Sequence, residues 1–216
     1  MISQDFIVDY IISCLSSGKR GKPCRDIVAV VRAILYRLKT GCQWRYLPMR
    51  QWSTTDNVLT YQTVYYHFRR WVDDGSFRQM WISILSKFKH YLDLSNINLD
   101  GSLTPALNGG EEVGFQGRIS SKATNMLFLT DNQGIVIAAS QPVAGNHHDL
   151  YNITEFLEQL WSMLREAGIN LDGLFLNADA GFDADSVRQS SECQGVIANL
   201  ALNERNGSLL DRDELF

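Results

Sequence analysis

The spacing of apolar residues changes along the chain, from helical periods in the front part to strand-like runs behind. Three segments repeat apolar residues every three or four positions, which predicts amphipathic helices over 27–40, 60–72 and 77–92. Gly41 follows the first where a C-cap glycine belongs, and Thr60 is placed to cap the second. The N-terminal stretch predicts a further helix with an apolar face made of Phe6, Ile7, Tyr10, Ile11 and Cys14.

Behind residue 94 the pattern becomes that of a mixed α/β sheet. Short apolar or alternating runs predict strands over 97–103, 123–130, 135–142, 174–176 and 195–202. Amphipathic helices are expected over 150–167 and 184–192, and the Gly-rich stretch 105–121 reads as a long mobile loop. The first three strands can form an antiparallel meander, and helical crossovers can join the last two. We therefore expect a helical domain, 1–93, and an α/β domain, 94–216.

The distribution of charge supports this division. The net charge is −4, but residues 1–99 carry 14 Lys and Arg against 7 Asp and Glu, whereas residues 100–216 carry 6 against 17. A front part of charge +7 and a back part of charge −11 suggest an anion-binding module joined to a cation-binding one. The four scattered cysteines form no CxxC pair, and no apolar run approaches the roughly 20 residues of a membrane helix. We expect a cytoplasmic protein with no membrane partner.

The helix expected over 60–72 carries candidate DNA-binding residues on the face away from its apolar stripe. Amide, phenol and guanidinium groups on one helical face can contact base edges and phosphates. Lys39 and Arg45, on the preceding helix and the link after it, belong to the same candidate set, and the short helices suggest a helix-turn-helix-like module. A merely solvated basic face is the alternative. The face itself consists of Gln62, Tyr66, Arg69 and Arg70.

Two aspartates lie within or directly behind predicted strands of the α/β domain. Asp100 lies in the strand over 97–103 and Asp179 follows the buried run 174–176; a glycine comes soon after each. Charge at such places is unfavourable unless it is paired or binds a cation. If the two strands are neighbours, the carboxylates can bind Mg²⁺ or Mn²⁺, which prefer oxygen ligands. Either aspartate could instead belong to an ordinary turn.

Adjacent histidines followed by an aspartate, His147, His148 and Asp149, invite a zinc interpretation. Neighbouring residues of a strand point to opposite faces, however, and no Cys or Glu nearby offers a third ligand at suitable spacing. We expect Asp149 to cap the helix that follows. Asp183 and Asp185 could support the metal ligands from behind, but acidic residues are favoured in the first turn of a helix anyway, so we expect them in the same capping role at the start of the next helix.

Several sequence blocks resemble the transposases of bacterial insertion sequences, the insertion sequence family five group of the four/five superfamily. LYRLKTGCQWRYLP and TVYYHFRRWVDDGSF resemble the DNA-binding region of that family, and GGEEVGFQGR, LFLTDNQGIVIAAS, GNHHDLY and GLFLNADAGFD resemble blocks of its core. The resemblance implies a ribonuclease H-like core with an Asp-Asp-Glu triad and two-metal phosphodiester chemistry. It assigns the first catalytic aspartate to Asp100 and the second to Asp179.

The third carboxylate of that family lies on a downstream helix, in a pattern of Tyr, two residues, Arg, three residues and Glu. No third catalytic carboxylate is found here: Glu204 lacks the preceding Tyr and Arg, and Glu214 is the third residue from the end. We expect a truncated chain, or one completed by a separately encoded C-terminal portion, that cleaves DNA poorly by itself.

Three functional hypotheses follow from these residues. The first is a DNA transposase that binds the terminal inverted repeats and target DNA as double strands, uses Mg²⁺ or Mn²⁺, and forms a homodimer to hold two ends. The second is a truncated, catalytically inactive DNA-binding remnant that competes with the full transposase. The third is a different Mg²⁺-dependent phosphoryl-transfer enzyme, which accounts for the aspartates but not for the basic, aromatic-rich helix.

Overall fold

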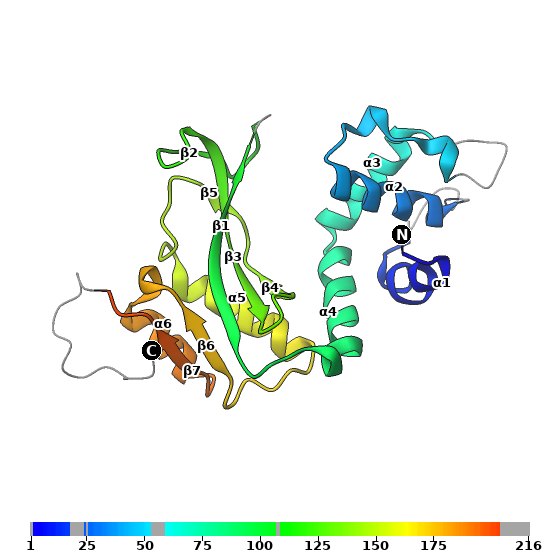
Figure 1. Ribbon diagram of the computed structural model, residues 1–216. Coiled ribbons are helices and arrows are strands. Elements are labelled where there is room, and N and C mark those ends of the chain that lie inside the picture. The colour runs from blue at the N-terminus through cyan, green and yellow to red at the C-terminus, as the bar shows by residue number, and fades with distance from the viewer. Residues whose placement is uncertain (1, 18–23, 25, 53–58, 107–108, 204–216) are drawn as a thin grey trace. The chain divides into compact units, whose positions relative to one another are not determined.

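The computed structural model describes residues 2–17, 24, 26–52, 59–106 and 109–203 (Figure 1). The chain forms two compact units, Met1–Ile84 and Leu85–Phe216, which divide within helix α4, Ser76–Phe88. The domain boundary expected near Leu94 lies behind the end of this helix and stays a prediction.

The first unit is helical, and its two main helices begin and end where their capping residues predict. Helix α2, Ile27–Thr40, starts at Asp26, whose side chain accepts a hydrogen bond from the Ala29 N–H, and ends at Gly41 with φ of 69°. Helix α3, Tyr61–Asp73, starts at Thr60 as expected. The predicted N-terminal helix is instead three short segments, α1 (Gln4–Phe6), the π-helical η1 (Ile7–Ile11) and the 3₁₀ turn η2 (Ile12–Cys14). Two further 3₁₀ turns, η3 (Trp44–Tyr46) and η4 (Met49–Gln51), follow α2.

One apolar core holds these helices together. Ile7, Val30, Val64 and Trp71 are almost completely buried in it. Trp44 of η3 packs its ring 5.0 Å from that of Phe68 and 5.4 Å from that of Tyr65, measured between centroids, so the link after α2 is fixed against α3. The exposed residues of η3 and α3 therefore keep a defined position relative to each other.

The second unit is built on one mixed sheet with the strand order β2-β3-β1-β6-β7. Strands β1 and β3 are antiparallel, whereas β6 runs parallel to β1 and β7 parallel to β6. The sheet thus begins with antiparallel strands and continues with parallel ones, as expected for the second unit. After the 3₁₀ turn η5 (Lys89–Tyr91), the strands are β1 (Ile97–Pro105), β2 (Gly114–Gln116), β3 (Ser121–Asp131), β4 (Val136–Ala139), β5 (Val143–Ala144), β6 (Phe175–Ala178) and β7 (Ile197–Leu200).

The two faces of this sheet differ. Helices α5 (Ile153–Glu166) and α6 (Asp185–Glu192) pack on the apolar face, which consists of buried residues such as Leu99, Leu129 and Leu176 (Figure 1). The other face carries the alternate residues, which are half-buried or exposed. Because side chains alternate along a strand, Asp100 belongs to this second face.

Two features of the second unit differ from the expectation. The Gly-rich stretch expected as a loop contains β2, which pairs with β3 from Gly114 to Gln116. The short strand β5 also pairs with β3, so β3 has partners along its whole length.

Within the described part of the chain, no helix has the length and apolar character needed to cross a membrane.

Candidate metal and nucleic-acid sites

The register of β1 and β6 brings the two predicted metal-binding aspartates to neighbouring positions. Leu99 pairs with Ala178, so Asp100 and Asp179 are the next residues along two adjacent parallel strands. Such strands lie about 4.8 Å apart, and both side chains continue the face of the polar pair Asn98 and Asn177. Residues 79 positions apart in the sequence thereby reach the same edge of the sheet.

Each aspartate is oriented by a glycine that follows it. The Gly101 N–H donates to Asp100 Oδ1 at 2.8 Å, and the Gly181 N–H donates to Asp179 Oδ1 at 2.9 Å. The 3₁₀ turn η6, Ala180–Phe182, begins at Asp179 and supplies the second donor. One oxygen of each carboxylate is thus engaged by the backbone, and no hydrogen bond within the described residues engages the other.

The charge of this pair is not balanced by a neighbouring cation. Both residues are exposed, and neither takes part in an ion pair within the described residues. Two carboxylates on adjacent strands repel each other, and a divalent cation between them would remove that repulsion. Carboxylate oxygens with room for water fit Mg²⁺ or Mn²⁺. The described residues contain no cluster of three or more His, Cys, Asp or Glu side chains that could hold a metal ion.

A row of asparagines crosses the sheet two residues before the aspartates on β1 and β6. The amide of Asn199 donates to Asn177 Oδ1 at 2.8 Å, and that of Asn177 donates to Asn98 Oδ1 at 3.5 Å. The row spans β7, β6 and β1, so it fixes the spacing of the strands that carry Asp100 and Asp179. No local pattern predicts this row, because the three asparagines are polar positions on three separate strands.

The two acidic residues behind Asp179 have different roles. Asp183 is 3% exposed and forms a 3.0 Å ion pair with Arg188, and its other oxygen accepts a 2.9 Å hydrogen bond from the Asn203 N–H. It anchors α6 and the segment behind β7 and does not cap α6, whose N-cap is Ala184. Asp185 is exposed in the first turn of that helix.

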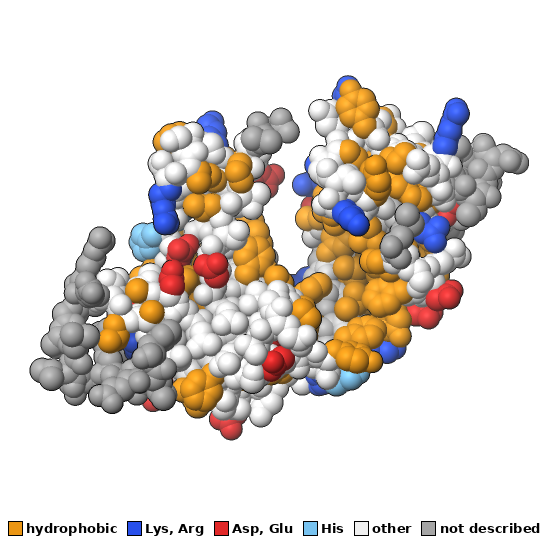
Figure 2. Space-filling view, viewed as in Figure 1, with side chains coloured by type: hydrophobic (Ala, Val, Ile, Leu, Met, Phe, Trp, Pro, Cys, Tyr) orange, Lys and Arg blue, Asp and Glu red, His pale blue; other side chains and the backbone are white. Residues whose placement is uncertain are grey.

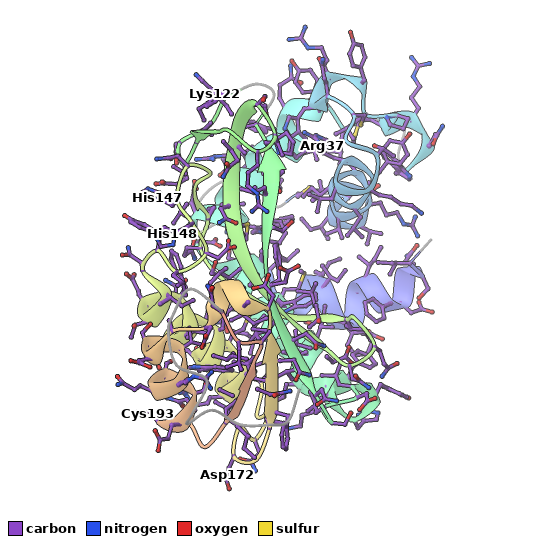
Figure 3. The ribbon with its side chains drawn as sticks, turned by 60° about the vertical axis from the view of Figure 1, so that its left-hand side comes forward. Arg37, Lys122, His147, His148, Asp172 and Cys193 are labelled. Atoms are coloured by element: carbon purple, nitrogen blue, oxygen red, sulfur yellow. The ribbon has the colours of Figure 1, made fainter. Side chains whose placement is uncertain are left out.

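The expectation that Asp149 caps the next helix is wrong. Helix α5 has Asn152 at its N-cap, without a side-chain capping bond, and Asp149 Oδ1 instead accepts a 2.9 Å hydrogen bond from Asn125. His147 stacks on Tyr151 with 3.7 Å between ring centroids, and His148 Nδ1 accepts a hydrogen bond from the Leu150 N–H. Figure 3 shows both histidines on the loop that leads into α5. The sequence analysis did not predict the role of Asn125, because it precedes Asp149 by 24 residues in the chain.

The candidate DNA-binding face of α3 is largely exposed. Gln62, Tyr66 and Arg69 are open to solvent, and Tyr66 is 61% exposed. Arg69 pairs with Asp73 at 3.5 Å, but both side chains remain at least half exposed, so the pair leaves the guanidinium accessible. Lys39 on α2 and Arg45 in η3 are exposed as well. Figure 2 shows Lys and Arg side chains standing out from the helical unit with hydrophobic side chains between them.

Arg70 differs from the rest of this set, because its guanidinium is engaged within the unit. Its Nη2 donates to Ser16 Oγ at 3.0 Å, its Nε lies 3.9 Å from Asp74, and its side chain is only 20% exposed. Hydrogen bonds from the hydroxyls of Ser16 and then Ser76 lower the pKa of Asp74, which keeps its carboxylate charged. This group of residues ties the segment before α2 to the end of α3.

The match to a known protein family lies in the helical unit. Residues 7–81 match the family described as "Putative transposase of IS4/5 family". This IS4/5-family match covers about a third of the chain and confirms the sequence resemblance for the two front blocks. It does not extend to Asp100 or Asp179. No curated protein matches the chain.

Solved transposase structures resemble the chain weakly. The "Mos1 transposase paired-end complex with left transposon end" has 13% sequence identity and a TM-score of 0.36, with 85% of this chain and 61% of that chain covered. The "Cryo-EM structure of piggyBac transposase synaptic complex with hairpin DNA" has 12% identity and a TM-score of 0.42, with 96% of this chain and 53% of that chain covered. The chain thus spans between half and two thirds of the length of these proteins.

Proposed function

We propose that this chain is a DNA transposase whose α3 face holds the terminal inverted repeats of its element and whose Asp100 and Asp179 bind Mg²⁺ or Mn²⁺ for phosphodiester cleavage and strand transfer. The observation that supports this best is the register of β1 and β6, which makes two exposed, unpaired aspartates neighbours. The family match of residues 7–81 supports the assignment of the front unit.

The chemistry needs oxygen ligands at the sheet edge and a grip on phosphates elsewhere. A pair of divalent ions, when bound, can activate a water or a 3′-hydroxyl and stabilise the leaving oxygen. Asp100 and Asp179 supply carboxylate oxygens, while the backbone N–H groups of Gly101 and Gly181 hold each carboxylate in one orientation. Gln62, Tyr66 and Arg69, with Lys39 and Arg45, bind the DNA, and Arg70 supports the helix that presents them.

A DNA-binding protein without catalytic activity is the second candidate. It is favoured by the donor set, because a two-metal site needs more anchors than two carboxylates and the described residues offer no third one beside them. In this case the helical unit would occupy terminal repeats without cutting them. A homodimer that brings two ends together is compatible with either candidate.

One assay separates the two candidates. Double-stranded DNA that carries the terminal repeats is incubated with the full chain in Mg²⁺ or Mn²⁺, and binding and strand cleavage are measured in the same samples. Metal-dependent cleavage that disappears in Asp100→Asn and in Asp179→Asn supports the transposase. Binding without cleavage supports the second candidate. Cleavage that survives both substitutions would contradict the assignment of these residues.

A further inference from the structure

Gly101, which follows Asp100, has no side chain, and the carboxyl group of Asp149 occupies the space that a side chain would fill. A Cβ built on Gly101 would lie 2.3 Å from Asp149 Oδ1 and 2.7 Å from its Cγ, far inside van der Waals contact. The Asp149 carboxyl group therefore rests directly on the Gly101 backbone. It does so on the face opposite to the Asp100 side chain, because successive side chains of a strand alternate. The φ angle of Gly101 is not positive, so only this contact requires glycine here.

Asp149 is held firmly in that place. Asn125 of β3, which is 3% exposed, donates to Asp149 Oδ1 at 2.9 Å, and its own Oδ1 has no hydrogen-bond partner within the described residues. The loop before Asp149 is fixed too, since the Gly145 N–H donates to Ala123 O at 2.9 Å and Gln116 Nε2 donates to Gly145 O at 2.7 Å. A Cβ on Gly145 would lie 2.6 Å from the Ala123 carbonyl oxygen, so only a glycine lets the loop approach β3 this closely.

The other side of the same peptide orients the metal-binding carboxylate. The Gly101 N–H is the donor to Asp100 Oδ1, so the position of Gly101 sets the position of that oxygen. Glycine has more backbone freedom than any other residue, and the pairing with Leu127 of β3 restrains Gly101 from the β3 side of the strand. Asp149 adds a contact from the apolar side.

We propose that Asp149, held by Asn125, is a positioning residue for the metal site: it presses on Gly101 and thereby fixes the carboxylate of Asp100. This rests on the proposed function, in which Asp100 binds the cation. It links the LDGS block around Asp100 to the HHD block around Asp149, which are distant in the sequence and meet at Gly101. Asp149 acts through the backbone and is not a ligand, because its carboxylate and that of Asp100 lie on opposite faces of β1.

The test is a titration of the full-length chain with Mn²⁺, in which free Mn²⁺ is measured by electron paramagnetic resonance. Asp149→Ala should weaken Mn²⁺ binding about tenfold, which is typical of residues that orient a metal ligand. Asp149→Asn should stay close to the wild type, because it fills the same space and can accept the same hydrogen bond. Gly101→Ala should weaken binding as Asp149→Ala does, since its methyl group displaces the carboxyl group.

The double variant gives the sharpest result. In Asp149→Ala the methyl group of Gly101→Ala no longer meets an oxygen, so the second substitution should cause no further loss. Additive losses would overturn the proposal, and so would wild-type Mn²⁺ binding in Asp149→Ala or Gly101→Ala. Gly101→Ala alone carries the test if Asp149→Ala does not fold, as judged by circular dichroism. Asp100→Asn is the reference: if it leaves Mn²⁺ binding unchanged, the metal site of the proposed function fails, and this inference fails with it.

Discussion

Arg69 and Arg70 are neighbours on α3, yet the structure predicts opposite consequences for their removal. Arg69 is half exposed and makes one long pair with Asp73. Arg70 is mostly covered and contacts both Ser16 and Asp74, whose side chains are also hydrogen-bonded to each other. Arg69→Ala should therefore affect DNA binding, whereas Arg70→Ala should affect the stability of the helical unit.

The magnitudes follow from these contacts. An exposed ion pair contributes about 0–1 kcal/mol, so Arg69→Ala should barely change the free energy of unfolding. The 3.0 Å hydrogen bond from Arg70 and its weaker 3.9 Å ion pair together should contribute about 1–2 kcal/mol. For a unit of this size that loss lowers Tm by about 5–10 °C. If Arg69 contacts one phosphate, its loss should reduce the slope of log K against log salt by about 1.

The two variants are compared by thermal unfolding and by fluorescence anisotropy with terminal-repeat DNA at several KCl concentrations. Arg165→Ala, on α5 of the other unit, removes the same charge and serves as the matched control. Arg69→Ala should lower the affinity and the salt slope with an unchanged Tm, and Arg70→Ala should lower Tm. The reasoning is refuted if Arg70→Ala keeps the wild-type Tm while it weakens binding as much as Arg69→Ala.

Two further predictions concern the half-buried His67 and the buried Asp183. Burial, and then the charge of Arg70, lowers the pKa of His67 in the folded protein. The unfolded chain therefore binds this proton more readily, and the free energy of unfolding should fall as the pH drops below about 6.5. His67→Gln should flatten this pH dependence, as measured by thermal unfolding between pH 7.5 and 5.5. Asp183→Asn breaks a buried ion pair with Arg188 of α6 and should lower the free energy of urea unfolding by about 3 kcal/mol. Asp185→Asn, at the exposed start of α6, should change it little. A urea midpoint for Asp183→Asn equal to that of Asp185→Asn would contradict the role of the pair.

Local patterns in the sequence predict much of this fold. Helix α2 begins and ends at the expected residues, because its apolar spacing and Gly41 are signals within a few positions of each other. The succession of strands and helices along the second unit was expected from apolar runs separated by a hairpin turn and by amphipathic helices. The order of the strands within the sheet was expected for β1 and β6, as the neighbours that carry the two aspartates. The strand β2 was missed, because three residues in a Gly-rich stretch show no alternation and gain their strand conformation from β3.

The parts of the sites that sequence could not predict depend on distant contacts. Asp149 precedes a helix, and this position predicts a capping role. Its hydrogen bond from Asn125 and its contact with Gly101 place the carboxyl group away from the helix end. Arg70 belongs to the basic face of α3 by its periodicity, and only Ser16, 54 residues away, reveals its structural role. Asp100 and Asp179 were singled out because a charge within or just behind an apolar strand is unusual in itself, and their role as metal ligands stays a prediction.

The central claim is that Asp100 and Asp179 bind the same cation, and iron-mediated cleavage of the polypeptide tests it most directly. Fe²⁺ can replace Mg²⁺, and with ascorbate and peroxide it cuts the backbone only close to where it is bound. We predict two cuts in the same sample, one near residue 100 and one near residue 179, both suppressed by excess Mg²⁺ and both lost in Asp100→Asn. A cut at only one of these positions, or two cuts of which Asp100→Asn removes just one, would contradict a shared site.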